Sequence, residues 1–195
     1  MGVSVWEVID AASTKPFGYV PFYPGPGVGG HCIPLDPYYL ANKAREFDFH
    51  TRFIELAAEI NEQMPYYVVS RITEALSAEG KSLKGAKILL LGVAYKKDVG
   101  DTRGSPSMKL IQLLQEKGAD VYYNDPYVLQ IQLSRGTLTS ANLTEECLSS
   151  MDCTVIATDH SCYDLDQVAA WSKLVFDTRG ATRKLKRDNI IRLRE

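Results

Sequence analysis

Lys87-Ile88-Leu89-Leu90-Leu91-Gly92-Val93 is the stretch that decides the fold class of this chain of 195 residues. An unbroken apolar run that ends in glycine is typical of a strand buried on both faces of a parallel sheet. Further strand patterns follow at 120–124, 153–157, 174–177 and 189–193, with helical patterns at 105–118 and 144–149. This alternation predicts a doubly wound parallel sheet with right-handed crossovers.

The first part of the chain has a different texture. Helical periodicity occurs at 3–12, at 37–44 and over a long stretch from 51 to 76, in which Pro65 is expected to cause a kink. A helix of about 28 residues would span about 40 Å, which suits a bridge between domains or an oligomer interface. We therefore divide the chain into a helical segment, 1–82, and a Rossmann-like α/β domain, 83–195.

Composition excludes several classes of protein. The net charge is −2, from 22 basic and 24 acidic residues, so nucleic acid and anionic membranes are not expected partners. No apolar run approaches the roughly 20 residues that cross a bilayer, and the N-terminus does not resemble a signal peptide. We predict a cytoplasmic protein.

The four cysteines lack the paired short spacing of structural zinc sites and are interpreted as reduced thiols. A zinc site could be imagined from Cys147, Cys153, His160 and Cys162, but the spacings are irregular and 153 falls inside an expected strand. No metal site is predicted.

Residues 13–37 are rich in glycine, proline and aromatic side chains, a composition that predicts a shaped loop rather than a flexible linker. Gly25-Pro26-Gly27-Val28-Gly29-Gly30 matches the G-x-G-x-x-G pattern of dinucleotide-binding loops. That fingerprint must follow a strand and open a helix, whereas this one follows aromatics and prolines and precedes Pro34. We interpret the glycines instead as a backbone cradle for a ligand.

Cys32 follows this loop directly. The alternatives are a small buried thiol, the commonest state of free cysteine, and a reactive residue on rigid exposed backbone, which the loop context favours. Asp36 could orient a water or a proton, or it could cap a helix that begins at Pro37.

Two cations are expected at the carboxyl edge of the sheet. Tyr95 and Lys96 follow the first strand, and Arg179 follows the fourth. Ligands of open α/β sheets bind at this edge, so the pair suits an anionic ligand, the alternative being surface charges beside a loop. His160 follows the third strand and is expected to hydrogen-bond a loop rather than to act in catalysis.

Together these motifs resemble the UDP-glucose/GDP-mannose dehydrogenase family over essentially the whole chain. The most specific segment is Pro24-Gly25-Pro26-Gly27-Val28-Gly29-Gly30-His31-Cys32-Ile33-Pro34-Leu35-Asp36-Pro37, which is similar to the branch that oxidises UDP-N-acetylhexosamines, especially UDP-N-acetylglucosamine. The segments 92–98 and 123–127 resemble the second domain of that family.

The resemblance implies an NAD-dependent 6-dehydrogenase. A C6 alcohol is oxidised to an aldehyde, which the Cys32 thiolate attacks to form a thiohemiacetal. A second hydride then leaves, and the resulting thioester is hydrolysed to a uronic acid with help from Asp36. The resemblance places the UDP-sugar against these residues: Phe22, Tyr23, Gly25, Gly27, Gly29, Gly30, Tyr95, Lys96 and Arg179. It also implies a homodimer through the long helix.

Two departures from the family pattern matter. A carboxylate that usually follows Arg103 is replaced by Gly104, so we expect a local ion pair to be lost. The N-terminal NAD-binding domain has no counterpart in this sequence, so we expect NAD to bind mainly outside it and the chain alone to be inactive. The alternative is a non-catalytic UDP-sugar-binding or dimerisation module.

Overall fold

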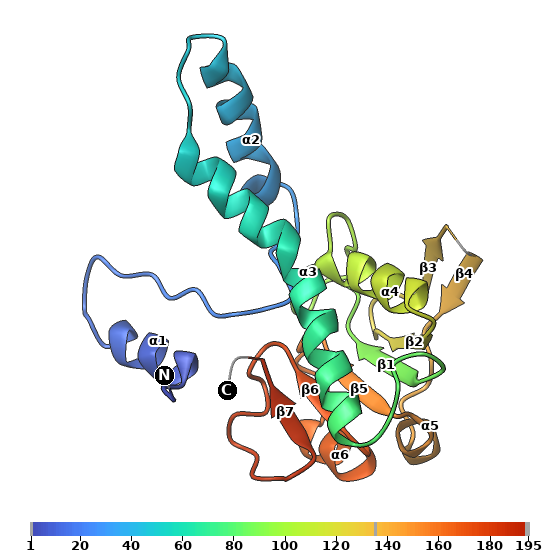
Figure 1. The fold of residues 1–195 in the computed structure, drawn as a ribbon. Coiled ribbons are helices and arrows are strands. Elements are labelled where there is room, and N and C mark those ends of the chain that lie inside the picture. Colours follow the sequence, from blue (N-terminus) through green and yellow to red (C-terminus); the bar gives the residue numbers. More distant parts are fainter. Residues whose placement is uncertain (1, 135, 194–195) are drawn as a thin grey trace.

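A computed structural model describes residues 2–134 and 136–193 (Figure 1). Five parallel strands form the main sheet in the order β2-β1-β5-β6-β7, with a separate antiparallel hairpin of β3 and β4. The strands are β1 (Lys87–Leu91), β2 (Asp120–Asn124), β3 (Gln130–Leu133), β4 (Gly136–Thr139), β5 (Cys153–Ile156), β6 (Val175–Asp177) and β7 (Ile190–Arg192). The predicted α/β class and parallel sheet are confirmed.

The helices are α1 (Val5–Ser13), α2 (Cys32–Arg45), α3 (Arg52–Ala78), α4 (Pro106–Glu116), α5 (Glu145–Ser150) and α6 (Leu165–Trp171). Ser105, Thr144 and Asp164 begin α4, α5 and α6 as N-caps, each with a side-chain oxygen that accepts a backbone N–H two or three residues on. The α6 helix and the β3–β4 hairpin were not predicted from the sequence.

Alternate residues of β1 enter two different cores, which explains its unbroken apolar run. Ile88 and Leu90 pack with the second half of α3 and with α4 on one face, while Leu89 and Leu91 pack with α5 and α6 on the other. The sheet is therefore covered on both faces, as a buried parallel sheet requires. Because both faces are covered, the ends of the strands are the parts of the sheet that a ligand can reach.

The long helix was predicted correctly, and it continues through Pro65, which is buried. Its second half, including Val68, Ile72 and Leu76, belongs to the core of the sheet. Its first half pairs with α2 in a hairpin that projects away from the sheet (Figure 1). The division of the chain at residue 82 stays a prediction.

The start of α2 differs from our expectation. We predicted a helix from Pro37 with Asp36 as a possible cap, but the helix begins at Cys32 and contains both Pro34 and Pro37. Pro34 is the third helical residue, where the N–H that proline lacks would have no partner within the helix, so it is tolerated. Asp36 is accordingly a helical residue and not an N-cap.

Candidate functional site

The strand order sets the place of the site. From β1 the chain moves to β2 on one side and later crosses to β5 on the other, so the direction of winding reverses between β1 and β5. Open α/β sheets bind ligands at the carboxyl ends of the strands beside such a reversal. The loops after β1, β5 and β6 meet at this edge, and they carry Lys96, His160 and Arg179 respectively.

Lys96 is exposed and Tyr95 is half-buried at the end of β1. The Lys96 ammonium lies 5.4 Å from the centre of the Tyr95 ring. The Tyr95 N–H donates to the Asp101 carbonyl at 2.9 Å, which closes the loop that holds both residues. A cation is thus presented to solvent at the expected edge.

Arg179 lies after β6 and is half-buried. Its Nε donates to the Ala157 carbonyl at 2.7 Å, and its backbone N–H donates to Asp177 at 2.8 Å. Burial lowers the pKa of its guanidinium, against the opposing effect of Asp159 and Asp177. Within the described residues Arg179 forms no ion pair, so its charge is available to an anionic ligand.

The glycine-rich loop connects the two strand ends. A Cβ on Gly25 would lie 2.7 Å from Nη1 of Arg179, and a Cβ on Gly30 would lie 3.0 Å from the Tyr95 ring. The loop is fixed to α3 by Asn61, whose Oδ1 accepts from the Val28 N–H at 2.7 Å and whose Nδ2 donates to the Val28 carbonyl at 3.1 Å. The segment 25–30 therefore crosses the carboxyl edge from the β6 end to the β1 end.

Packing also explains why glycine occupies these positions, a role that the cradle interpretation did not include. A Cβ on Gly29 would lie 2.6 Å from the Gly104 carbonyl, and one on Gly27 would lie 3.1 Å from the Pro106 side chain. These glycines allow two chain segments to approach closely, so they are required by packing whether or not a ligand uses their N–H groups.

Cys32 and Asp36 are one helical turn apart on α2, so they share a face, and both are exposed. Cys32 is the first residue of the helix, an end that favours negative charge. The interpretation of Cys32 as a small buried thiol is therefore wrong, and so is its placement in an irregular loop. Its neighbour Gly30 contacts Tyr95, which places the cysteine beside the β1 loop.

Tyr23 and Phe22 lie at the start of this loop, where Tyr23 borders two clefts and Phe22 borders one of them. Tyr23 donates to Asp10 at 2.8 Å and stacks on Trp6 with ring centres 5.9 Å apart. It also borders a cleft of about 520 Å³, lined with Asp159, Arg179, Arg183 and Lys184. Phe22 is 75% exposed and borders an apolar cleft of about 890 Å³ between the loop, α2 and α3.

Comparison with known proteins agrees with this arrangement. Residues 89–184 match the UDP-binding domain of the UDP-glucose/GDP-mannose dehydrogenase family, and residues 1–63 match its central domain. Together the two matches cover most of the chain.

The chain belongs to the UDP-glucose/GDP-mannose dehydrogenase family.

Two curated relatives illustrate the sequence similarity. Over 187 residues the chain is 37% identical to a UDP-N-acetyl-D-mannosamine dehydrogenase of Methanococcus maripaludis, covering 92% of this chain and 41% of the relative. Over 182 residues it is 33% identical to an NDP-N-acetyl-D-galactosaminuronic acid dehydrogenase of Ralstonia nicotianae, with the same coverage. The chain thus spans about two-fifths of the length of these relatives.

Solved structures of the family have the same fold. A UDP-D-ManNAc dehydrogenase of Pyrococcus horikoshii superposes with a TM-score of 0.80 at 32% identity, covering 98% of this chain and 44% of that one. An NDP-N-acetyl-D-galactosaminuronic acid dehydrogenase of Methanosarcina mazei gives 0.82 at 25% identity, covering 99% and 44%. The Rossmann-like description of the sheet domain is therefore confirmed.

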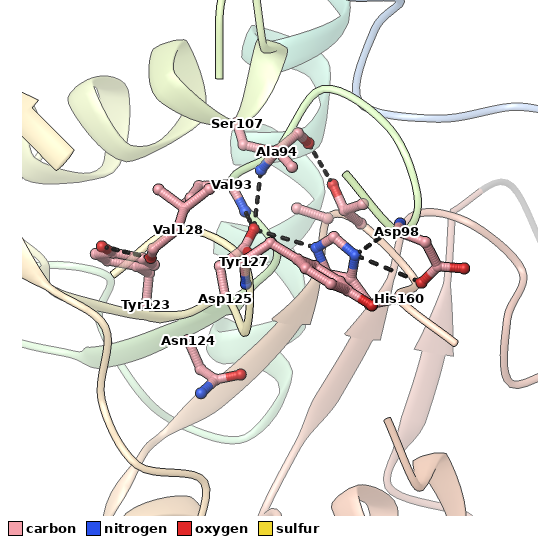
Figure 2. Close-up of polar contacts among 12 residues, drawn as sticks. Val93, Ala94, Asp98, Ser107, Tyr123, Asn124, Asp125, Tyr127, Val128 and His160 are labelled. Atoms are coloured by element: carbon pink, nitrogen blue, oxygen red, sulfur yellow. Dashed lines mark hydrogen bonds and ion pairs between the residues drawn. The ribbon is translucent and has the colours of Figure 1, made fainter. Parts of the chain in front are cut away.

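Sequence reasoning missed a buried pair beside the β1 loop. Asp125 Oδ2 accepts from the Val93 and Ala94 N–H groups at 2.9 and 3.0 Å and contacts His160 Nε2 at 3.1 Å, as Figure 2 shows. His160 Nδ1 accepts from the Asp98 N–H at 2.9 Å. The expected hydrogen-bonding role of His160 is confirmed, whereas Asp125 was noted only as part of the family-like segment 123–127, with no role assigned to it.

A second missed group attaches α1 to the sheet domain. Arg183 pairs with Asp10 at 2.9 Å and lies 5.3 Å from the ring centres of both Trp6 and Tyr23. The hydrogen bond from Tyr23, reinforced by Arg183, lowers the pKa of Asp10. The basic run 179–187 is evident in the sequence, but nothing there identifies Asp10 as its partner.

The departure at Gly104 leaves Arg103 with another partner and gives the loop a close contact that we did not predict. Arg103 is not left without a carboxylate, because its Nη2 and Nε contact Asp101 at 2.8 to 3.1 Å. The hydrogen bonds from Arg103 lower the pKa of Asp101 to about 2. Gly104 itself has a φ of 63° and approaches Gly30, where a Cβ would lie 2.9 Å from the carbonyl oxygen. Arg103 therefore keeps an ion pair with Asp101, and the expected loss of a pair with a carboxylate at position 104 stays a prediction.

The remaining cysteines do not form a metal centre in the described part of the chain. No group of three or more potential ligands gathers within residues 2–134 and 136–193. Cys153 is fully buried in β5, where desolvation raises the pKa of its thiol to about 12. Across the same described ranges, no helix combines the length and hydropathy of a membrane span.

Proposed function

We propose that this chain forms the C-terminal part of an NAD-dependent 6-dehydrogenase that oxidises a UDP-N-acetylhexosamine to its uronic acid. The observation that carries the proposal is the path of the loop 25–30. It runs from Arg179 at the end of β6 to Tyr95 at the end of β1 and leads directly into Cys32. Two candidate anion-binding cations and a candidate nucleophile are thereby joined along one edge of the sheet.

In the proposed binding mode Lys96 and Arg179 neutralise the diphosphate of the UDP-sugar. Arginine is suited to this because its planar fork can form two hydrogen bonds to phosphate oxygens at once. Tyr23 and Phe22 border the clefts on either side of Arg179 and would contact the apolar parts of the ligand. The backbone of 25–30 would lie over the sugar and diphosphate.

In the proposed reaction Cys32 Sγ attacks C6 of the aldehyde formed by the first oxidation, giving a thiohemiacetal. Loss of a second hydride leaves a thioester, and water adds to it to release the carboxylate and regenerate the thiol. A thiolate suits both roles because it is a strong nucleophile and a good leaving group. Asp36, one turn along α2, would orient the water.

NAD would accept the hydrides, but the described residues do not fit a site for it. The only G-x-G-x-x-G segment in those residues opens a helix yet follows no strand, and its glycines are packed against Tyr95, Gly104 and Pro106. No residue of this chain is therefore assigned to NAD. In this proposal the cofactor binds mainly to a part of the full-length enzyme that the chain does not include, and the chain alone is inactive.

The identity of the hexosamine is the most specific element of the proposal. The motif at 24–37 resembles the UDP-N-acetylglucosamine branch, whereas the relatives above are named for N-acetyl-D-mannosamine and N-acetyl-D-galactosaminuronic acid. We propose the shared class, a UDP-linked 2-acetamido hexose, and treat the C2 configuration as the variable to be tested.

We also propose a cytoplasmic homodimer formed through α3. Large apolar side chains along the α2–α3 hairpin are exposed, including Phe53 at 89%, Ile60 at 52% and Leu40 at 60%. Several large exposed apolar side chains on one element favour an interface as their function.

Calorimetric titration of the chain tests the binding part of the proposal. UDP, UDP-N-acetylglucosamine, UDP-N-acetylmannosamine and UDP-glucose should bind, and NAD should not. Lys96→Ala and Arg179→Ala should each weaken binding about tenfold or more, since a charged hydrogen bond contributes about 1.5–3 kcal/mol.

Lys117→Ala is the matched control, because Lys117 is an exposed lysine at the end of α4, where the chain turns toward the amino end of β2. It should leave the affinity unchanged. Tight NAD binding would contradict the domain assignment, and absence of UDP binding would contradict the assignment of Lys96 and Arg179. A preference between the two acetamido sugars would decide the C2 configuration.

A further inference from the structure

The segment that carries Lys96 is held at both ends by side chains from other parts of the fold. At its start, Asp125 accepts the Val93 and Ala94 N–H groups at 2.9 and 3.0 Å. At its end, His160 accepts the Asp98 N–H at 2.9 Å. These two side chains come from the loops after β2 and β5, the strands on either side of β1. Figure 2 shows both converging on the segment 93–98.

The geometry fixes the protonation of the pair. His160 Nδ1 is an acceptor, so the ring proton is on Nε2, which faces Asp125 Oδ2 at 3.1 Å. Both side chains are fully buried. Burial raises the pKa of Asp125, but hydrogen bonds from His160 and from backbone N–H groups outweigh it and leave that pKa below its usual value. A charged carboxylate is thus held under the loop with its hydrogen-bonding capacity used.

The backbone between these anchors is in a conformation that the residues would not choose alone. Asp98 has a φ of 59°, one of two positive φ values at non-glycine residues in the described chain. Asp98 is kept there by His160 and by Ser161, whose N–H and hydroxyl contact the Asp98 carboxylate at 2.8 and 2.6 Å. Strained backbone persists only where its surroundings determine it, and it is common at functional sites.

The ring of His160 has fixed neighbours as well. The centre of Tyr127 lies 5.0 Å away and that of Tyr163 lies 5.6 Å away, in tilted and edge-on arrangements. Tyr127 also donates its backbone N–H to Asp125 at 2.9 Å. The pair is therefore held by contacts that lie outside the 93–98 segment.

We propose that Asp125 and His160 are positioning residues for the nucleotide-sugar site, and that together they fix the 93–98 segment so that Lys96 meets the diphosphate of the ligand. This inference rests on the proposed function, since it takes Lys96 to be a ligand contact. Neither residue touches the ligand. Their effect on binding passes through Lys96, because fixing the loop in advance removes the cost of ordering it on binding.

A double-mutant cycle tests this role. His160→Phe keeps an aromatic ring between the two tyrosines but removes both hydrogen bonds, and it should weaken UDP binding by a factor similar to Lys96→Ala, about tenfold. The double variant should bind little more weakly than either single variant, because both act on one interaction. His160→Gln can accept from Asp98 and donate to Asp125, so it should restore affinity to within about threefold of the wild type.

Ser172→Ala is the control for a general loss of stability. It removes a buried hydrogen bond of 2.9 Å to Thr154, away from the carboxyl ends of the strands. The variant should have a lower melting temperature and an unchanged affinity for UDP. The positioning role is overturned if His160→Phe binds UDP with wild-type affinity. It is also overturned if the fold loss of affinity in the double variant equals the product of the losses in His160→Phe and Lys96→Ala. If the wild-type chain binds UDP and the Lys96→Ala variant binds it with the same affinity, the proposed site is overturned instead.

Hydrogen exchange on the unliganded wild-type protein gives a second test that needs no variant. The amide protons of Val93, Ala94 and Asp98 should already be protected before ligand is added, because each is bonded to a buried side chain. If they exchange freely and become protected only with UDP, the ligand orders the loop and the inference is wrong.

Discussion

Two glycines of the same loop differ in what surrounds them. Gly25 and Gly29 both have backbone conformations open to alanine, so any cost of substitution comes from neighbouring atoms. Beside Gly25 the nearest atoms belong to the end of the Arg179 side chain, which can move. Beside Gly29 the nearest atom is the backbone carbonyl oxygen of Gly104, which would lie 2.6 Å from an alanine methyl group and cannot move without the loop.

Gly25→Ala should therefore affect ligand binding, and Gly29→Ala should affect stability. Gly25→Ala should displace Arg179, weakening UDP binding while leaving the melting temperature nearly unchanged. Gly29→Ala should lower the free energy of unfolding by about 1–3 kcal/mol, as overpacking of rigid surroundings does. Thermal unfolding and calorimetric titration of both variants decide the matter, and equal destabilisation by the two would contradict it.

At the scale of elements, α1 is attached to the sheet domain by a small number of contacts. Trp6 is 2% exposed, and its ring fills the space above Gly180, where a Cβ would approach within 2.9 Å. Arg183 covers the rings of Trp6 and Tyr23 and pairs with Asp10. The segment between α1 and α2 contains no regular helix or strand, so these contacts set where α1 lies.

Arg183→Ala should loosen α1 from the sheet domain. In a Trp171→Phe background, which leaves Trp6 as the one tryptophan, we expect red-shifted emission and stronger quenching by iodide. The physical reason is that removing the guanidinium exposes the outer face of the indole and ends the pairing with Asp10. Lys186→Ala, an exposed neighbouring cation, should change neither signal. Unaltered emission in Arg183→Ala would show that the packing on Gly180 is sufficient.

At the scale of the whole molecule, the α2–α3 hairpin stands away from the sheet (Figure 1). Large apolar side chains along the hairpin are exposed. The half of α3 that packs on the sheet buries its apolar residues, whereas the hairpin half leaves Phe53, Leu56 and Ile60 largely exposed. One helix thus has a half that packs on the sheet and a half that is exposed, and the proposed homodimer would cover the exposed half.

The proposed homodimer predicts a measurable mass. Light scattering should give about twice the 21.7 kDa of one chain, and Phe53→Glu should reduce it to that of the monomer, because a charge would be buried at the interface. Ser77→Glu adds the same charge at an exposed position at the far end of α3 and should leave the dimer intact. A wild-type mass of a single chain would contradict dimerisation through this surface.

The sequence by itself determined the sheet and the edge at which the candidate site lies. The runs at 87–93, 153–157 and 174–177 are largely apolar on both faces, and such runs have few alternatives to a covered parallel sheet. The run at 120–124 instead alternates between buried and exposed residues, as an outer strand of the sheet does. Once strands are parallel, the residues after them must share one edge, so Lys96 and Arg179 could be placed there without coordinates. The long helix was equally clear from its periodicity. The β3–β4 hairpin, by contrast, has only four residues per strand and a mixed pattern, too little for a distinct signal.

Only the tertiary structure decided what surrounds those residues. The start of α2 at Cys32, the crossing of the loop 25–30 between two strand ends, and the Asp125–His160 pair all depend on contacts between segments far apart in sequence. A glycine in the sequence shows that a Cβ is absent, but not whether a ligand or Gly104 occupies the space. Local patterns report the periodicity of one segment, whereas close approach and buried hydrogen bonds arise only when distant segments pack together.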